Sequence, residues 1–234
     1  MHTFLDAKHM AKALRQSLAA REIYLQHSDC LELVAKQFGF AEWNMLAARI
    51  EAAQLPRLRL PEGWFVSRHT GADQYRIGLD PDRPGTVLIQ SIPGSGIAPG
   101  AIGVLMQSVA AAPWRGRKIR LSAELRCESA DLATIWMRVD PEAGKALRFD
   151  NLLDRKSAGA IEGTQEWTER SIVLDVPAAA ASVHYGIFLR ETGRMWARNV
   201  RIGPVGDGMA VTGGPRLLDG PTNLDFSSAD RPAA

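Results

Sequence analysis

Two neighbouring stretches of the chain place an indole among charged side chains of both signs. They are Trp136-Met-Arg-Val-Asp140 and, after a turn at Gly144, Arg148-Phe-Asp-Asn151. Because successive side chains of a β-strand point to opposite faces, every second residue of each stretch should lie on one surface. If the two stretches pair as a hairpin, this surface collects Trp136, Arg138, Asp140, Arg148 and Asp150. Asp154, Arg155 and Trp167 follow soon after and are expected at its rim.

This predicted surface has two interpretations. In the functional one it is a groove for a small polar ligand such as a carbohydrate, with the indole stacked on a flat ring and the Arg and Asp side chains holding hydroxyl or carboxylate groups. In the structural one the charges form a cross-strand ladder of ion pairs on a solvated face, and Trp136 folds onto its neighbours. The sequence leaves both open.

The sequence contains little that supports a catalytic or a metal-binding function. None of the five histidines has another at ligand spacing, and the cysteines Cys30 and Cys127 do not form the pairs of a zinc ribbon. The glycine-rich stretch 93–100 lacks the Lys-Ser/Thr ending of a phosphate-binding loop. Ser171, Asp175 and His184 supply the types of a nucleophilic triad, but no nucleophile elbow frames a serine. We therefore assign no catalytic residue, metal ligand or cofactor, and favour a non-catalytic protein over an enzyme.

Two kinds of periodicity divide the chain. Apolar residues recur every three or four positions over residues 3–21, 28–39 and 43–55, which predicts three helices around one small core. From Leu60 onward, short β-type runs alternate with Gly, Pro and Asp, which is typical of a sandwich or barrel. The expected strands are 64–68, 75–79, 86–91, 118–127, 133–139, 146–151, 168–175, 182–190 and 195–202, and the segment 99–112 fits a bulged strand or a short helix.

We therefore expect a mainly β protein in three parts. A three-helix domain occupies residues 1–55, an antiparallel β-sandwich residues 56–206, and an extended or disordered tail residues 207–234. The composition, with 46% hydrophobic and 23% charged residues, is that of a folded globular protein. Because no apolar run is long enough to cross a membrane and the start lacks a signal-peptide pattern, we expect a cytoplasmic protein without membrane contact.

Charge argues against a nucleic-acid partner. The net charge is only +2, and residues 1–55 carry six basic and six acidic side chains. Although the second and third helices could form a pair like a helix-turn-helix, DNA binding needs a basic face for the phosphates. A protein partner or a homodimer formed through the helical domain stays open.

The N-terminal residues resemble a known family. The stretches Phe4-Leu-Asp-Ala-Lys8, 27–35 and 38–46 are similar to the small helical domain called glyoxalase-related, which occurs beside varied partners in proteobacterial proteins. The resemblance covers residues 1–53 and implies, as an alternative function, a lyase of glyoxalase or isomerase type. Those activities belong to paired βαβββ modules with His and Glu metal ligands, which are not found here, so no catalytic residue is carried over.

The rest of the chain resembles the jelly-roll, galactose-binding-like modules, a class similar to carbohydrate-binding modules. This resemblance spans about residues 60–206, and it implies a jelly-roll sandwich that binds or senses a ligand without fixing which one. The segments that carry it are 114–122, 136–140, 149–151, 163–167, 173–177 and 196–200. We thus predict a non-catalytic binding or sensing protein, with the lyase and a regulatory module acting through the helical domain as alternatives.

Overall fold

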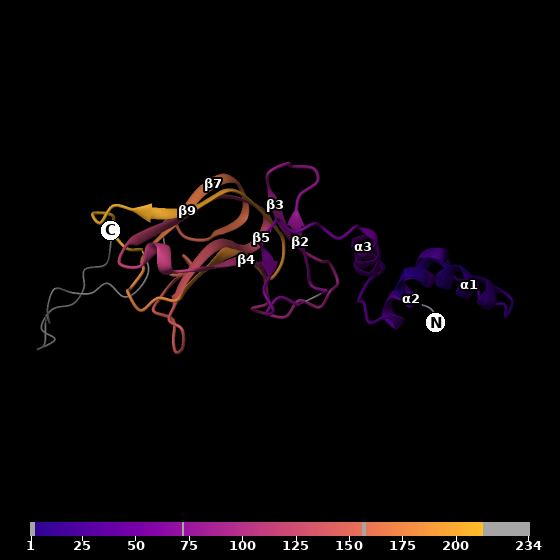
Figure 1. Ribbon diagram of the computed structural model, residues 1–234. Helices are drawn as coiled ribbons and strands as arrows, with labels where there is room; N and C mark the ends of the chain where they lie inside the picture. The colour runs from indigo at the N-terminus through magenta and orange to yellow at the C-terminus, as the bar shows by residue number, and fades with distance from the viewer. Residues whose placement is uncertain (1–2, 72, 156–157, 213–234) are drawn as a thin grey trace, which may run out of the picture.

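The computed structural model describes residues 3–71, 73–155 and 158–212, with three helices at one end and a β-sandwich at the other (Figure 1). The fold is mainly β with a helical N-terminal domain, as predicted. Most of the predicted tail, residues 213–234, lies outside the described residues. The start of that tail is tied to the sandwich, because the Thr212 hydroxyl accepts a hydrogen bond from the Val173 N–H at 2.6 Å.

The helical domain has its own core. It consists of the 3-10 turn η1 (Phe4–Asp6) and the helices α1 (Ala7–Ala19), α2 (His27–Gln37) and α3 (Trp43–Gln54). The apolar faces meet at Ala7, Ala11, Cys30, Val34, Leu46 and Ile50. Gly39, at φ 82°, reverses the chain after α2. Glu32 of α2 then accepts a hydrogen bond at 2.9 Å from the Trp43 N–H, which joins α2 to the first turn of α3.

Nine antiparallel strands follow within the described residues. They are β1 (Phe65–Val66), β2 (Tyr75–Leu79), β3 (Val87–Ser91), β4 (Ile102–Ala110), β5 (Lys118–Asp140), β6 (Arg148–Asp150), β7 (Ile161–Asp175), β8 (Ser182–Arg190) and β9 (Arg194–Val205), with a short 3-10 turn η2 (Ala112–Trp114) before β5. The segment that the sequence left between strand and helix is thus mainly strand β4.

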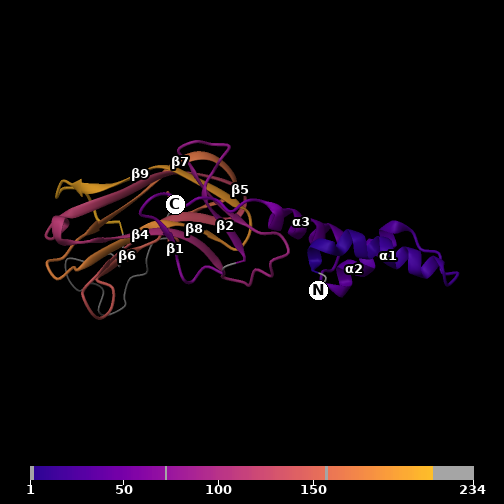
Figure 2. The same ribbon diagram turned by 45° about the vertical axis from the view of Figure 1, so that its right-hand side comes forward.

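The strands form two layers that share β5. One sheet, called the groove sheet, has the order β1-β4-β8-β5-β6 and contains residues 132–140 of β5. The other, called the ladder sheet, has the order β2-β3-β9-β5-β7; there β9 pairs with residues 118–128 of β5 and β7 with residues 118–133. Figure 2 shows β7 and β9 in one layer and β4, β6 and β8 in the other. Buried side chains from both layers fill the space between them, among them Leu105, Leu121, Ile135, Ile172 and Ile187. This is the predicted antiparallel sandwich.

The 23-residue strand β5 replaces two predicted strands, 118–127 and 133–139. Its pairing with β7 shifts register three times between Leu125 and Ala133, and Ser129 adopts φ 48°. Such bulges bend a strand without ending it. The chain therefore passes from one layer to the other without a turn, which the alternation of residues alone does not reveal.

The helical domain and the sandwich touch through a linker and a loop. The linker after α3 lies along β2, where the Leu79 N–H donates to the Arg59 carbonyl at 2.7 Å. The loop after β3 approaches the helices at Gly94, where a Cβ would lie 2.6 Å from the Phe40 ring. Gly94 also has φ 68°, a conformation that favours glycine. Within the described residues, no helix is long and apolar enough to cross a membrane.

Candidate functional site

The two stretches that carry the predicted surface do pair, as β5 and β6, but in a register that separates their charges. Arg138 lies opposite Phe149, whereas Val139 lies opposite Arg148 and Met137 opposite Asp150. Trp136, Arg138 and Asp140 therefore face outward from the groove sheet, and Arg148 and Asp150 belong to the other face. The expected common wall of four charges is wrong, because a shift of one residue moves every side chain to the opposite face.

Arg148 and Asp150 have partners of their own. The Arg148 Nε donates to Asp175 at 2.7 Å, and this hydrogen bond is the main reason why the pKa of the guanidinium is raised. Asp150 is buried and accepts hydrogen bonds from the Leu152 N–H and the Arg155 guanidinium. Both residues thus anchor the β6 edge and the loop that follows it.

The predicted rim residues also lie elsewhere. Arg155 is bound to Asp150 and to the Thr212 carbonyl, and Asp154 is exposed in the loop after β6 without lining the groove. Trp167 lies on the outer face of the ladder sheet, where the Arg198 guanidinium stacks 4.1 Å from its ring centroid. The sequence could not place Trp167, because its position depends on which layer β7 joins.

A groove of about 630 Å³ covers the outer face of the groove sheet around Trp136. Its floor and walls are mainly apolar and aromatic, from β1, β4, β5, β6 and β8. They comprise Phe65, Val66, Ile102, Val104, Met106, Trp136, Phe149 and Phe188, while Ser67, Arg68, His69, Ser108, Arg138, Asn151 and His184 are polar. An apolar cavity of this size with a few polar groups is the usual form of a small-molecule site.

The polar end of the groove is a hydrogen-bonded cluster. The Arg138 Nε and Nη2 both donate to Asp140 Oδ2, at 3.0 and 2.8 Å. His184 lies between two serine hydroxyls, with Ser108 Oγ 2.7 Å from Nδ1 and Ser182 Oγ 2.9 Å from Nε2, and Asp140 Oδ2 is 3.4 Å from Nε2. The cluster therefore fixes the orientation of both the guanidinium and the imidazole.

Burial lowers the pKa of His184, and the nearby Arg138 charge adds to this effect while Asp140 opposes it. The imidazole is therefore neutral at neutral pH, with one ring nitrogen donating and the other accepting. Ser108, His184 and Asp140 share the types of a nucleophilic triad, but Asp140 is already engaged by Arg138 and Ser108 lies inside the β4–β8 ladder, opposite His184. The arrangement positions the imidazole and does not identify a nucleophile.

Two buried polar atoms beside the groove have no hydrogen-bond partner within the described part of the chain. They are the Trp136 Nε1 donor and the Asp140 Oδ1 acceptor. An unpaired buried donor or acceptor costs about 1–3 kcal/mol. A ligand that shifts the side chains covering these atoms could recover part of that cost.

The groove residues of β1 and β4 are not among the residues that the sequence predicts for the site. Ile102, Val104 and Met106 face outward from β4, while Leu105 between them faces the core. Apolar residues on both faces of a strand indicate that neither face is simply solvated. The sequence of β4 shows this pattern of apolar residues on both faces. The pairing of β4 with β8, however, joins residues about 80 positions apart, and local periodicity does not predict it.

The ion-pair ladder considered for the Trp136 surface does not form, because Arg148 and Asp150 belong to the other face. A ladder of different residues lies on the outer face of the ladder sheet. There Arg120 pairs with Glu169 at 2.6 Å, and Arg198 pairs with Glu124 at 2.8 Å. Arg83 and Arg126 lie over the Trp196 ring at 4.8 and 5.2 Å from its centroid. The two outer faces thus differ: one has a groove with an apolar floor, and the other has a ladder of charges.

The family described as Glyoxalase superfamily protein matches residues 1–72, which confirms the resemblance of the N-terminal residues. The Uncharacterized HTH-type transcriptional regulator YbfP of Bacillus subtilis (strain 168) is 34% identical over 178 residues, 70% of this chain. The chain covers 56% of that relative's length.

Solved structures similar to the chain include xylan-binding domains. The CBM22-1 domain from Paenibacillus barcinonensis Xyn10C gives a TM-score of 0.42 at 10% identity, covering 64% of this chain and 90% of that one. The active domain of tailspike protein 4 from bacteriophage CBA120 gives 0.44 at 17% identity, covering 62% of this chain and 20% of that one.

Proposed function

We propose that the chain is a non-catalytic binding or sensing protein whose groove binds a small polar ligand such as a carbohydrate. The observation that carries this proposal is the Trp136 groove itself, because it combines an indole, an apolar floor and a fixed polar cluster at one end. Stacking on an indole suits the flat apolar face of a sugar ring, and the polar cluster suits its hydroxyl groups. The volume of about 630 Å³ is sufficient for a small oligosaccharide.

The polar cluster supplies directional contacts at low entropic cost. The Arg138 side chain is already held by Asp140, and the His184 ring by two serines. Groups that are fixed before binding lose little conformational freedom when a ligand arrives. Trp136 Nε1 and Asp140 Oδ1 are buried, and they become a further donor and acceptor for hydroxyl groups only when the side chains that cover them move.

The test is a titration of the purified chain with a panel of neutral and acidic mono- and oligosaccharides, followed by calorimetry and thermal unfolding. At least one sugar should bind and raise the unfolding temperature, since a ligand that prefers the folded state stabilises it. Trp136→Ala should weaken that binding by about tenfold or more, or about 1.4 kcal/mol.

Trp167→Ala is the matched control, because that indole lies on the opposite sheet. It should leave the affinity unchanged. If no sugar shifts the unfolding temperature, or if the two tryptophan variants weaken binding equally, the groove is not the site.

A regulatory role is the second candidate, and it is supported by the similarity to an HTH-type transcriptional regulator. In that case ligand binding in the sandwich would control a protein partner, or a homodimer, that docks on the helical domain of a cytoplasmic protein. A lyase of glyoxalase type is the remaining alternative, supported only by the family match at residues 1–72. Turnover of a hemithioacetal by the purified chain would favour the lyase, and ligand-dependent dimerisation in sedimentation would favour the regulator.

A further inference from the structure

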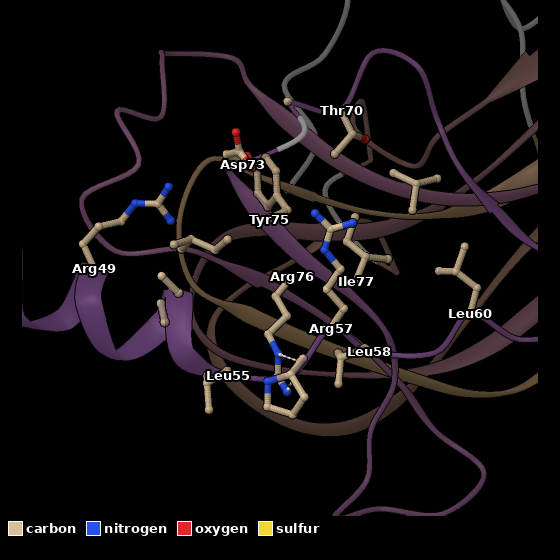
Figure 3. Close-up of a pocket in the computed structure, with 16 residues that line it drawn as sticks. Arg49, Leu55, Arg57, Leu58, Leu60, Thr70, Asp73, Tyr75, Arg76 and Ile77 are labelled. Atoms are coloured by element: carbon tan, nitrogen blue, oxygen red, sulfur yellow. Dashed lines mark hydrogen bonds between the residues drawn. The ribbon is translucent and has the colours of Figure 1, made fainter. Parts of the chain in front are cut away.

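A second cavity, of about 550 Å³, lies where the helical domain meets the sandwich, and it is separate from the Trp136 groove. Its lining comes from the C-terminal half of α3, the linker and β2, together with the loop before β2 (Figure 3). It thus joins two parts of the chain that have separate hydrophobic cores. Ligand sites occur preferentially at such interfaces between domains.

Positive charge prevails in this cavity. Three arginines line it, Arg49 from α3, Arg57 from the linker and Arg76 from β2, against the single exposed carboxylate of Asp73. Within the described residues none of the three arginines forms an ion pair with a carboxylate. The cavity therefore carries a net charge of +2 from its lining residues, three arginines less one aspartate.

The arginines reach the cavity from different sides. In Figure 3, Arg49 extends from the helix, Arg57 points towards Thr70 and Tyr75, and Arg76 turns towards Pro56. Arg76 donates from Nε and Nη2 to the Pro56 carbonyl at 3.4 and 3.3 Å, which holds the linker against β2. Arg57 is left to contact a ligand, and so are the N–H groups of Arg49, whose guanidinium lies over the Phe4 ring at 5.7 Å from its centroid. A guanidinium presents paired N–H groups that match a carboxylate or a phosphate.

The remaining wall is apolar. It includes Leu55, Leu58 and Ile77, and the ring of Tyr75. The Tyr75 hydroxyl is already bound to the Ala101 and Glu191 carbonyls, each at 3.0 Å, so this residue offers its ring rather than its hydroxyl. An occupant of the cavity would therefore meet cations on one side and an apolar surface on the other.

We propose that this cavity binds an organic anion whose carboxylate or phosphate is held by Arg49 and Arg57 and whose apolar body packs against Leu55, Leu58 and Tyr75. The site does not depend on the function proposed for the Trp136 groove. Because its lining comes from both α3 and β2, the bound anion connects the helical domain to the sandwich. Binding then favours the docked arrangement of the two over any looser one.

The experiment uses three probes that share a naphthalene ring: 1-naphthoate, 1-naphthyl phosphate and the neutral 1-naphthalenemethanol. Their affinities for the full chain are measured by calorimetry at constant ionic strength. The two anions should bind at least tenfold more tightly than the alcohol, and the tighter of the two identifies the carboxylate or the phosphate as the preferred group. Arg57→Gln and Arg49→Gln should each weaken anion binding about tenfold or more, because a charge-assisted hydrogen bond is lost.

Arg59→Gln is the matched control, since Arg59 is an exposed linker arginine that does not line the cavity. It should leave anion affinity within about twofold, and all variants should unfold at the temperature of the parent chain without ligand. Trp136→Ala should also leave anion affinity unchanged. Equal binding of the alcohol, equal loss in Arg59→Gln, or loss in Trp136→Ala would each overturn the proposal.

Discussion

At the scale of single residues, His184 shows how hydrogen bonds and burial keep an imidazole neutral at the polar end of the groove. Its two ring nitrogens contact Ser108 and Ser182, and its pKa is lowered first by burial. A neutral imidazole can donate to one serine and accept from the other, whereas an imidazolium can only donate. Protonation therefore reverses one of these two hydrogen bonds and adds a positive charge to a buried site next to Arg138.

This lowered pKa makes stability depend on pH in a definite direction. Below the ordinary histidine pKa of about 6.5, the unfolded chain binds a proton that the folded chain resists. The free energy of unfolding should therefore fall as the pH drops below that value, and His184 should contribute no slope above it. Urea denaturation at pH 5, 6, 7 and 8 measures the effect.

His184→Gln should flatten the pH dependence between pH 5 and 6.5, because glutamine does not titrate. His9→Gln, on the exposed side of α1, is the control and should leave the slope unchanged. If the free energy of unfolding depends on pH in His184→Gln as it does in the parent chain, other groups cause that dependence.

At the scale of elements, the groove depends on close packing between β4 and β8. Gly186 of β8 lies opposite Trp136 in register, and a Cβ there would lie 2.3 Å from the Leu105 carbonyl oxygen. The backbone of β4 has no room to retreat without losing its pairing with β8. The glycine is therefore required by the neighbouring strand rather than by its own conformation.

Gly186→Ala should destabilise the sandwich by about 1–3 kcal/mol, the usual cost of overpacking. Gly203→Ala in β9 is the control, because a Cβ at that position would meet nothing within 4 Å. Urea denaturation of the two variants should differ by at least about 1 kcal/mol. Equal stabilities would mean that β4 and β8 can separate locally at little cost.

The sequence predicted the kinds of element better than their partners. Alternation and turn residues were sufficient for the helices and for most strands, because both signals are local. Register was not predictable in this way, since the connection between Asp140 and Arg148 sets which side chains of β6 face outward. Trp136, Arg138 and Asp140 were placed together correctly by parity within one strand. Arg148 and Asp150 were not, because their position relates two strands.

At the scale of the whole molecule, the helical domain rests against the sandwich through few contacts. Gly94 meets the Phe40 ring, and the linker follows β2. The helical core and the sandwich core are separate clusters. Small interfaces of this kind allow relative motion of domains, so single contacts can decide how firmly they are docked.

Gly94→Ala should loosen this docking. Gly94 and Gly96 both have φ 68°, so an alanine at either position has a similar backbone cost, but only at position 94 would the new Cβ meet the Phe40 ring. Hydrogen exchange of the α3 and linker amides should therefore accelerate in Gly94→Ala and stay unchanged in Gly96→Ala. Equal exchange in both variants would show that the loop after β3 does not hold the helices.

Because β5 runs through both sheets, it affects how the molecule unfolds. Both sheets contain part of the same continuous strand β5, so neither sheet can unfold while the other stays intact. On heating, the described part of the chain should unfold as two cooperative units, the helical domain and the whole sandwich. A sugar bound to the groove sheet would therefore also slow the unfolding of the ladder sheet, although the sugar does not contact that sheet.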